Sequence, residues 1–147
     1  MVYRKMLSAS VYALAGLLAP AGASAMDLMM TTVLYNQTPI EVRGGVQNVE
    51  FKTIPATDGI TVWPKIGVSL FQSTHAAYRA DFEGMEGPHV HYCEVHIQTW
   101  AKHTFFGGFT ATACQADVKH TMAGWRCEAG ASQPSAGGCS FTLTLRK

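Results

Sequence analysis

The sequence contains 147 residues, with 11 Lys and Arg against 10 Asp and Glu, for a formal net charge of +1 at pH 7 with neutral histidines. Binding to nucleic acid or to anionic lipid depends on clustered Lys and Arg, and this chain has no basic run. The composition therefore argues against both kinds of partner.

The first 25 residues have the pattern of a cleaved secretory signal peptide. Arg4 and Lys5 precede an uncharged, mostly apolar segment, residues 6–19, and Ala23-Ser24-Ala25 supplies the small residues of a cleavage site. The apolar segment is shorter than the roughly 20 residues that a membrane-spanning helix needs. We therefore predict cleavage after Ala25, a periplasmic or secreted protein, and no membrane span in the mature form.

Cleavage leaves residues 26–147, a length that suits one domain with a single hydrophobic core. The leader contains two cations and no acid, so nine Lys and Arg remain against ten Asp and Glu, a formal charge of −1. Short segments rich in β-branched and aromatic residues follow between turn signals. They include Thr31–Tyr35, Val46–Ile54 and Ile60–Trp63.

The longest β-like segment runs from Gly87 to Lys102 and holds three of the six histidines. In a strand, residues two apart share a face. One face is expected to carry His89, His91, Cys93, Val95, Ile97 and Thr99, and the other Val90, Tyr92, Glu94, His96, Gln98 and Trp100.

The His89–His91 pair gives this segment a metal-binding hypothesis. At roughly 3.3 Å per residue, the two histidines lie about 6.6 Å apart along one face, which suits chelation of zinc or copper. His96 joins them only if a β-bulge shifts the register by one residue. A stable site needs three to four protein ligands, so another would have to come from elsewhere. The alternative is a solvated strand face without a metal, and no other cofactor is predicted.

Alternation is clearest near the C-terminal end, where Phe141, Leu143 and Leu145 alternate with Ser and Thr. This pattern predicts a strand with one buried face. Roughly eight to ten short strands, without a convincing helix of three turns, predict an all-β domain. We expect an antiparallel β-sandwich, with a β-barrel as the alternative.

Four cysteines, an even number in an exported domain, predict two disulfides. Three pairings of four cysteines are possible and the sequence alone does not choose among them. We favour Cys93–Cys114 and Cys127–Cys139, because each pair flanks a plausible chain reversal. The oxidising compartment and the lack of a Cys-x-x-Cys pair argue against thiolate metal ligands.

No catalytic motif is present: the sequence lacks a Gly-x-Ser-x-Gly elbow, a His-Glu-x-x-His helix and a phosphate-binding glycine loop. We therefore predict a small exported binding module and not an enzyme. Its partner would be a protein, a glycan or a cell-envelope ligand, and inhibition of a secreted enzyme is one form of this function.

Tyr and Trp are favoured in recognition patches, so the candidate partner contacts are Trp63, Tyr92, Trp100 and Trp125, with core packing as the alternative for each. Two other functions stay open. One is a periplasmic zinc- or copper-binding protein that uses the His-x-His strand. The other is a structural subunit of the cell envelope whose edge strands pair with neighbours.

Overall fold

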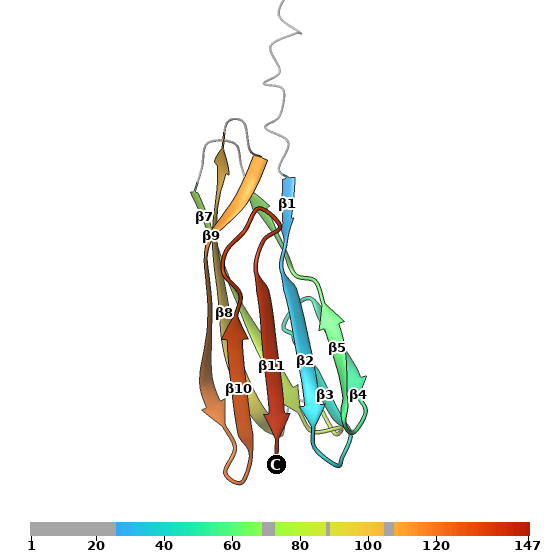
Figure 1. Ribbon diagram of the computed structural model, residues 1–147. Helices are drawn as coiled ribbons and strands as arrows, with labels where there is room; N and C mark the ends of the chain where they lie inside the picture. Colours follow the sequence, from blue (N-terminus) through green and yellow to red (C-terminus); the bar gives the residue numbers. More distant parts are fainter. Residues whose placement is uncertain (1–25, 69–72, 88, 105–107) are drawn as a thin grey trace, which may run out of the picture.

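The computed structural model describes residues 26–68, 73–87, 89–104 and 108–147, so the predicted signal peptide, residues 1–25, lies outside the described residues. Every regular element in these ranges is a β-strand (Figure 1). Within the same ranges there is no helix of the length and apolar character that crossing a bilayer requires. The strands are β1 (Met26–Met29), β2 (Thr31–Gln37), β3 (Val42–Val46), β4 (Glu50–Ile54), β5 (Asp58–Val62), β6 (Lys65–Val68), β7 (Ser73–Glu83), β8 (His91–Thr104), β9 (Gly108–Thr121), β10 (Arg126–Ala131) and β11 (Ser140–Arg146).

The strands form two main sheets that pack face to face, which confirms the predicted sandwich (Figure 1). The larger sheet has the order β4-β3-β7-β8-β9 and the smaller sheet the order β10-β11-β2-β5, while β1 and β6 pair separately. Neighbouring strands are antiparallel except β11 and β2, which run parallel. The described strands therefore make two sheets and no closed barrel.

Alternating apolar side chains on the inner faces build the core. In β11, Phe141, Leu143 and Leu145 are fully buried, as predicted, and Thr142 between them is exposed. Leu34 of the adjacent β2 is also fully buried. Complete burial of a side chain of this size contributes roughly 1.5–3 kcal/mol relative to leaving it in water.

β8 follows the predicted alternation over most of its length. Cys93, Val95, Ile97 and Thr99 are fully buried, whereas the side chains between them are partly exposed. The pattern breaks at the start of the strand: Phe82 pairs with Cys93, but Glu83 pairs with His91, so a β-bulge lies at Tyr92.

Two disulfides join the sheets, but both predicted pairings are wrong. The bonds are Cys93–Cys127, from β8 to β10, and Cys114–Cys139, from β9 to the segment that leads into β11. The register explains the correction. Cys114 lies opposite Thr99 on β8, six residues from Cys93. Six residues of strand span about 20 Å, far beyond the reach of a disulfide.

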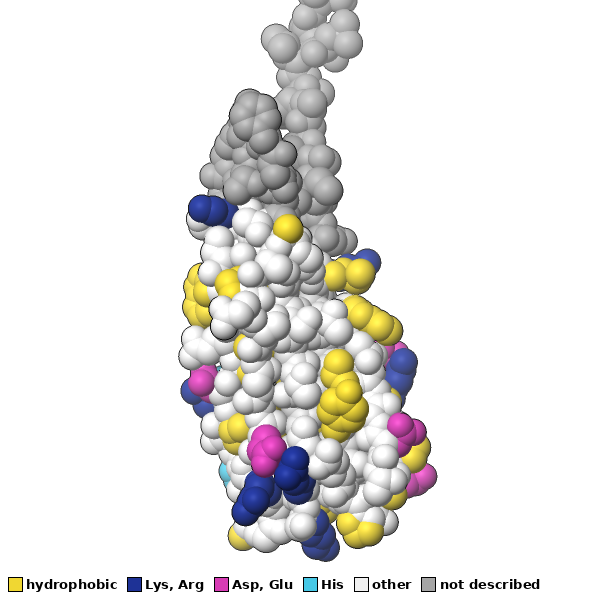
Figure 2. Space-filling view, in the orientation of Figure 1, with side chains coloured by type: hydrophobic (Ala, Val, Ile, Leu, Met, Phe, Trp, Pro, Cys, Tyr) yellow, Lys and Arg dark blue, Asp and Glu magenta, His cyan; other side chains and the backbone are white. Residues whose placement is uncertain are grey.

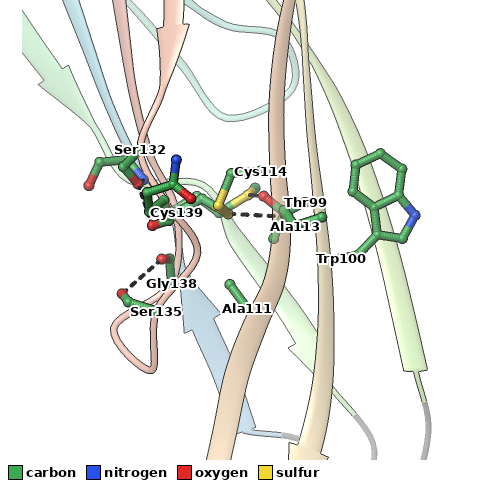
Figure 3. The surroundings of a disulfide bond; sticks show 12 residues. Thr99, Trp100, Ala111, Ala113, Cys114, Ser132, Ser135, Gly138 and Cys139 are labelled. Atoms are coloured by element: carbon green, nitrogen blue, oxygen red, sulfur yellow. Dashed lines mark hydrogen bonds between the residues drawn. A yellow bond between two sulfur atoms is a disulfide. The ribbon is translucent and has the colours of Figure 1, made fainter.

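The loop before β11 lies next to the second disulfide (Figure 3). Ser135 and Gly138 form an isolated bridge there, and the Ser135 hydroxyl donates to the Gly138 carbonyl at 3.2 Å. Gly138 has a φ of 98°, in the left-handed region that favours glycine. Trp100 points away from this disulfide (Figure 3), on the outer face of the larger sheet.

The opposite side of the sandwich, where β4 and β5 lie, is held by hydrogen bonds from one buried amide. Asn36 of β2 donates from Nδ2 to the carbonyls of Ile40 at 2.7 Å, Ile54 at 3.2 Å and Pro55 at 3.0 Å. Its Oδ1 accepts from the Thr38 backbone at 3.1 Å and from the Thr38 hydroxyl at 2.6 Å. Since Ile54 ends β4, this network connects the two sheets.

Candidate recognition site

Two aromatic rings stack at the end of the sandwich where the β9–β10 turn lies. Tyr92 comes from the bulged start of β8 and Trp125 from the turn before β10. Their ring centroids are 4.0 Å apart with an interplanar angle of 22°. Both side chains are only partly buried, and both pack against the core. The two rings therefore expose apolar surface to solvent while their buried parts pack against the core.

Backbone and covalent bonds fix this aromatic pair. The Cys93–Cys127 disulfide joins the residue after Tyr92 to a residue two positions after Trp125. The Met122 amide donates to the Tyr92 carbonyl at 2.9 Å, and the Trp125 amide donates to the Met122 carbonyl at 3.0 Å. Gly124 supplies the positive φ, 83°, that the turn requires. The rings are therefore held in place before any partner arrives.

A cationic hollow, which we call the basic pocket, adjoins Trp125. It is lined by Gly124, Trp125, Arg126, Arg146 and Lys147. Lys147 Nζ lies 5.1 Å from the centroid of the Trp125 ring, within the range of a cation–π interaction. Figure 2 shows Lys and Arg side chains gathered at this end of the molecule, where β11 ends.

The charges in the basic pocket are not balanced. Arg126 and Arg146 are directly opposite each other in the β10–β11 register, an arrangement that repels. Glu128 lies 3.5 Å from Arg146, and both side chains are exposed. Among the charged side chains here, the three cations outnumber Glu128, so the side chains leave the pocket with a positive charge, although residues 26–147 together are slightly negative.

A second hollow, which we call the acidic groove, adjoins Tyr92. Its walls include Ile40, Glu41, Met85, Glu86, Val90 and Tyr92. Ile40 and Met85 are 41% and 45% exposed, and both glutamates are exposed as well. Because Tyr92 lines this groove and Trp125 lines the basic pocket, the stacked rings stand between two hollows of opposite charge.

The outer face of the larger sheet carries a separate group of polar side chains. Asp81 is fully buried, and its Oδ2 accepts from Arg79 Nε at 2.8 Å. Its Oδ1 lies 3.8 Å from His91 Nδ1, and neither atom has a hydrogen-bond partner among the described residues. Burial raises the pKa of the Asp81 carboxyl above its usual value, while the hydrogen bond and charge of Arg79 oppose the shift.

The three histidines proposed as metal ligands do not share one strand face. His89 is an exposed turn residue, because β8 begins at His91. His91 faces Asp81, and His96 Nε2 lies 2.8 Å from Glu94 Oε1 on the outer face. Among the described residues, no group of three His, Cys, Asp or Glu side chains is arranged to hold a metal ion. Zinc or copper binding therefore stays a prediction from the sequence.

The aromatic residues predicted as partner contacts are also separated. Trp63 is 51% exposed just after β5. Trp100 stacks on His75, with ring centroids 4.7 Å apart. Of the predicted contacts, Tyr92 and Trp125 belong to the site described above. Sequence reasoning missed Arg126, Arg146 and Lys147, whose signal is their position at the paired ends of β10 and β11.

Comparison with known proteins assigns no family: no family model matches the sequence, and no curated protein matches it significantly.

Proposed function

We propose that this protein is a binding module that works outside the cytoplasm and holds its partner at the Tyr92–Trp125 pair. Two disulfides and no free cysteine fit an extracellular or periplasmic location. The partner class is a protein, a glycan or another envelope ligand, and a secreted enzyme that the module inhibits is included.

The observation that carries the proposal is a partly exposed aromatic pair held rigid before binding. Tyr and Trp dominate binding energy at interfaces because they bury a large area and lose little side-chain entropy. A disulfide and two backbone hydrogen bonds hold this pair, which lowers the ordering cost of association further. The two hollows beside the pair supply the polar contacts that give specificity.

Capture of partners from an envelope or culture extract tests this function. The immobilised protein is compared with Trp125→Ala and with Trp63→Ala, a matched loss of an exposed indole away from the site. We expect Trp63→Ala to retain the same partner and Trp125→Ala to bind it at least about tenfold more weakly, as expected for a truncated aromatic anchor.

Circular dichroism and thermal unfolding must show that Trp125→Ala is folded. Trp125→Phe, which keeps a ring in the stack, is the second variant and should bind with an intermediate affinity. Binding that is lost in Trp63→Ala, or unchanged in Trp125→Ala, contradicts the proposal. The metal-binding and envelope-subunit functions stay predictions that no observation on the described residues favours.

A further inference from the structure

We infer that the partner is a polypeptide segment with one acidic and one basic side chain, placed on the two sides of the Tyr92–Trp125 pair. This inference rests on the proposed function and specifies its partner class. It follows from the opposite charges of the basic pocket and the acidic groove.

The basic pocket is suited to a carboxylate. Arg126 and Arg146 face each other across β10 and β11, and a carboxylate between them would replace their repulsion with attraction. A guanidinium group binds a carboxylate through two parallel hydrogen bonds, which fixes the geometry as well as the charge. Glu128 lies beside Arg146 and leaves Arg126 and Lys147 for a ligand.

The acidic groove is suited to a Lys or Arg side chain. Ile40, Met85 and Val90 give it apolar walls, and Glu41 and Glu86 carry its negative charge. Long basic side chains lay their methylene groups on apolar surface and keep the charged end beside carboxylates or water. The acidic groove supplies both the apolar walls and the carboxylates.

The pairing of opposite charges distinguishes among partner classes. A uniformly anionic polymer, such as a nucleic acid or an acidic polysaccharide, gains from the basic pocket but is repelled by Glu41 and Glu86. A neutral glycan uses neither charge. A second copy of this chain carries both signs too, but its charged side chains line hollows and do not project from an extended segment. A peptide carries both signs on side chains long enough to enter both hollows.

The geometry also sets the spacing of the two charges on the peptide. Tyr92 lines the acidic groove, Trp125 lines the basic pocket, and the centroids of their stacked rings are 4.0 Å apart. An extended chain rises about 3.3 Å per residue. The acidic and basic residues are therefore expected about two to four positions apart, with an apolar residue between them over the rings.

Fluorescence anisotropy with labelled decapeptides tests the inference. The probe carries Glu and Arg three positions apart with Leu between them, in a Gly–Ser background. Controls are a Glu/Glu peptide, a Gly/Gly peptide and an oligogalacturonate of similar length. We expect the mixed-charge peptide to bind at least about tenfold more tightly than each control, and its affinity to fall as salt rises.

Charge reversal supplies the matched variants. Arg126→Glu should weaken the mixed-charge peptide at least about tenfold and should restore binding of a peptide in which Lys replaces Glu. Glu86→Lys should weaken the same probe, and Lys65→Glu, on β6, should leave it unchanged. The rescue separates a charge contact from general damage to the fold.

Three results would overturn the inference. The first is equal or tighter binding of oligogalacturonate. The second is a salt-sensitive dimer in sedimentation that Arg126→Glu abolishes, which would make a second copy the occupant. The third is an extract partner that requires Trp125 but ignores both charge reversals; in that case the proposed function stands and the peptide class fails. Failure of the proposed function itself looks different, since no partner would then depend on Trp125.

Discussion

The two lateral sides of the sandwich join the sheets by different means. On the β9–β10 side, Cys93–Cys127 and Cys114–Cys139 cross between the sheets and use all four cysteines. On the β4–β5 side, Asn36 binds three carbonyls and Thr38. A disulfide acts mainly by restricting the unfolded chain, whereas the Asn36 network acts only where the folded geometry brings its partners together.

Reduction should therefore destabilise the β9–β10 side, whereas loss of packing or hydrogen bonds should destabilise the β4–β5 side. The proposed recognition site, the Tyr92–Trp125 pair, lies on the covalent side, beside Cys93–Cys127. Its geometry should therefore depend on the redox state of the compartment, while the hydrogen-bonded side should not.

The largest expected effect is on the covalent side. Replacing Cys93 and Cys127 together by Ala should lower the free energy of unfolding by about 3 to 4 kcal/mol, given a sequence separation of 34 residues. The Cys114 and Cys139 double variant should lose a similar amount. Urea unfolding measures both losses of stability. Only the Cys93/Cys127 double variant should also bind the captured partner more weakly. Equal binding losses would contradict the role of Cys93–Cys127 at the site.

On the hydrogen-bonded side, Asn36→Ala should cost about 2 to 3 kcal/mol, because it leaves buried carbonyl groups without a donor. Asn36→Asp should also destabilise, since it keeps the acceptor for Thr38 but loses the donor. The matched control is Gln37→Ala, an exposed neighbour on β2 with an expected change within about 0.5 kcal/mol. The loss in Asn36→Ala should be the same with or without reductant in unfolding experiments; a loss that appears only under reduction would contradict the comparison.

Two glycines with positive φ test the loops of the covalent side. Gly138→Ala should cost about 2 kcal/mol or more, because it adds a clash with the Met29 carbonyl oxygen to the backbone strain. Gly124→Ala meets no atom and should cost only the strain, about 1 kcal/mol. Thermal unfolding measures both variants. Equal losses of stability in the two variants would mean that backbone strain alone, without the clash, accounts for the effect at Gly138.

The smallest effect is expected on the outer face of the larger sheet, away from both sides. Since the folded-state pKa of Asp81 is raised by burial, this group favours folding most below its ordinary pKa, and the contribution is lost as pH rises through the raised value. The unfolding free energy of wild type relative to Asp81→Asn should therefore fall as pH increases from about 4 toward neutral. A series of urea titrations over this range measures the slope, and a rising difference would contradict the sign.

The sequence predicted what depends on local alternation. Phe141, Leu143 and Leu145 were expected on one face, and they are buried together. The same rule placed Val95 and Ile97 inside and failed at the start of β8, where the bulge and a turn separate His89 from the strand. A bulge depends on how β7 and β8 pair, and local alternation does not encode that pairing.

Pairings between distant segments were the part that could not be predicted. The disulfides were assigned by closeness along the chain, but the β8–β9 register places Cys114 opposite Thr99. Tyr92 and Trp125 were each expected as partner contacts, but their stacking into one candidate site could not be predicted for the same reason. Tyr92 and Trp125 are 33 positions apart, and they meet only because β8, β9 and the turn before β10 adopt one particular arrangement.

The parallel pairing of β11 with β2 also governs the order in which the domain is built. Thr31 lies opposite Ser140, so β2 receives this neighbour only after about 100 further residues have been made. Until then, β2 presents an unsatisfied edge on its β11 side, and closing so long a loop delays the productive encounter. The smaller sheet is therefore completed at its centre last, and until then the open edge of β2 is a site where the unfinished chain can pair with another.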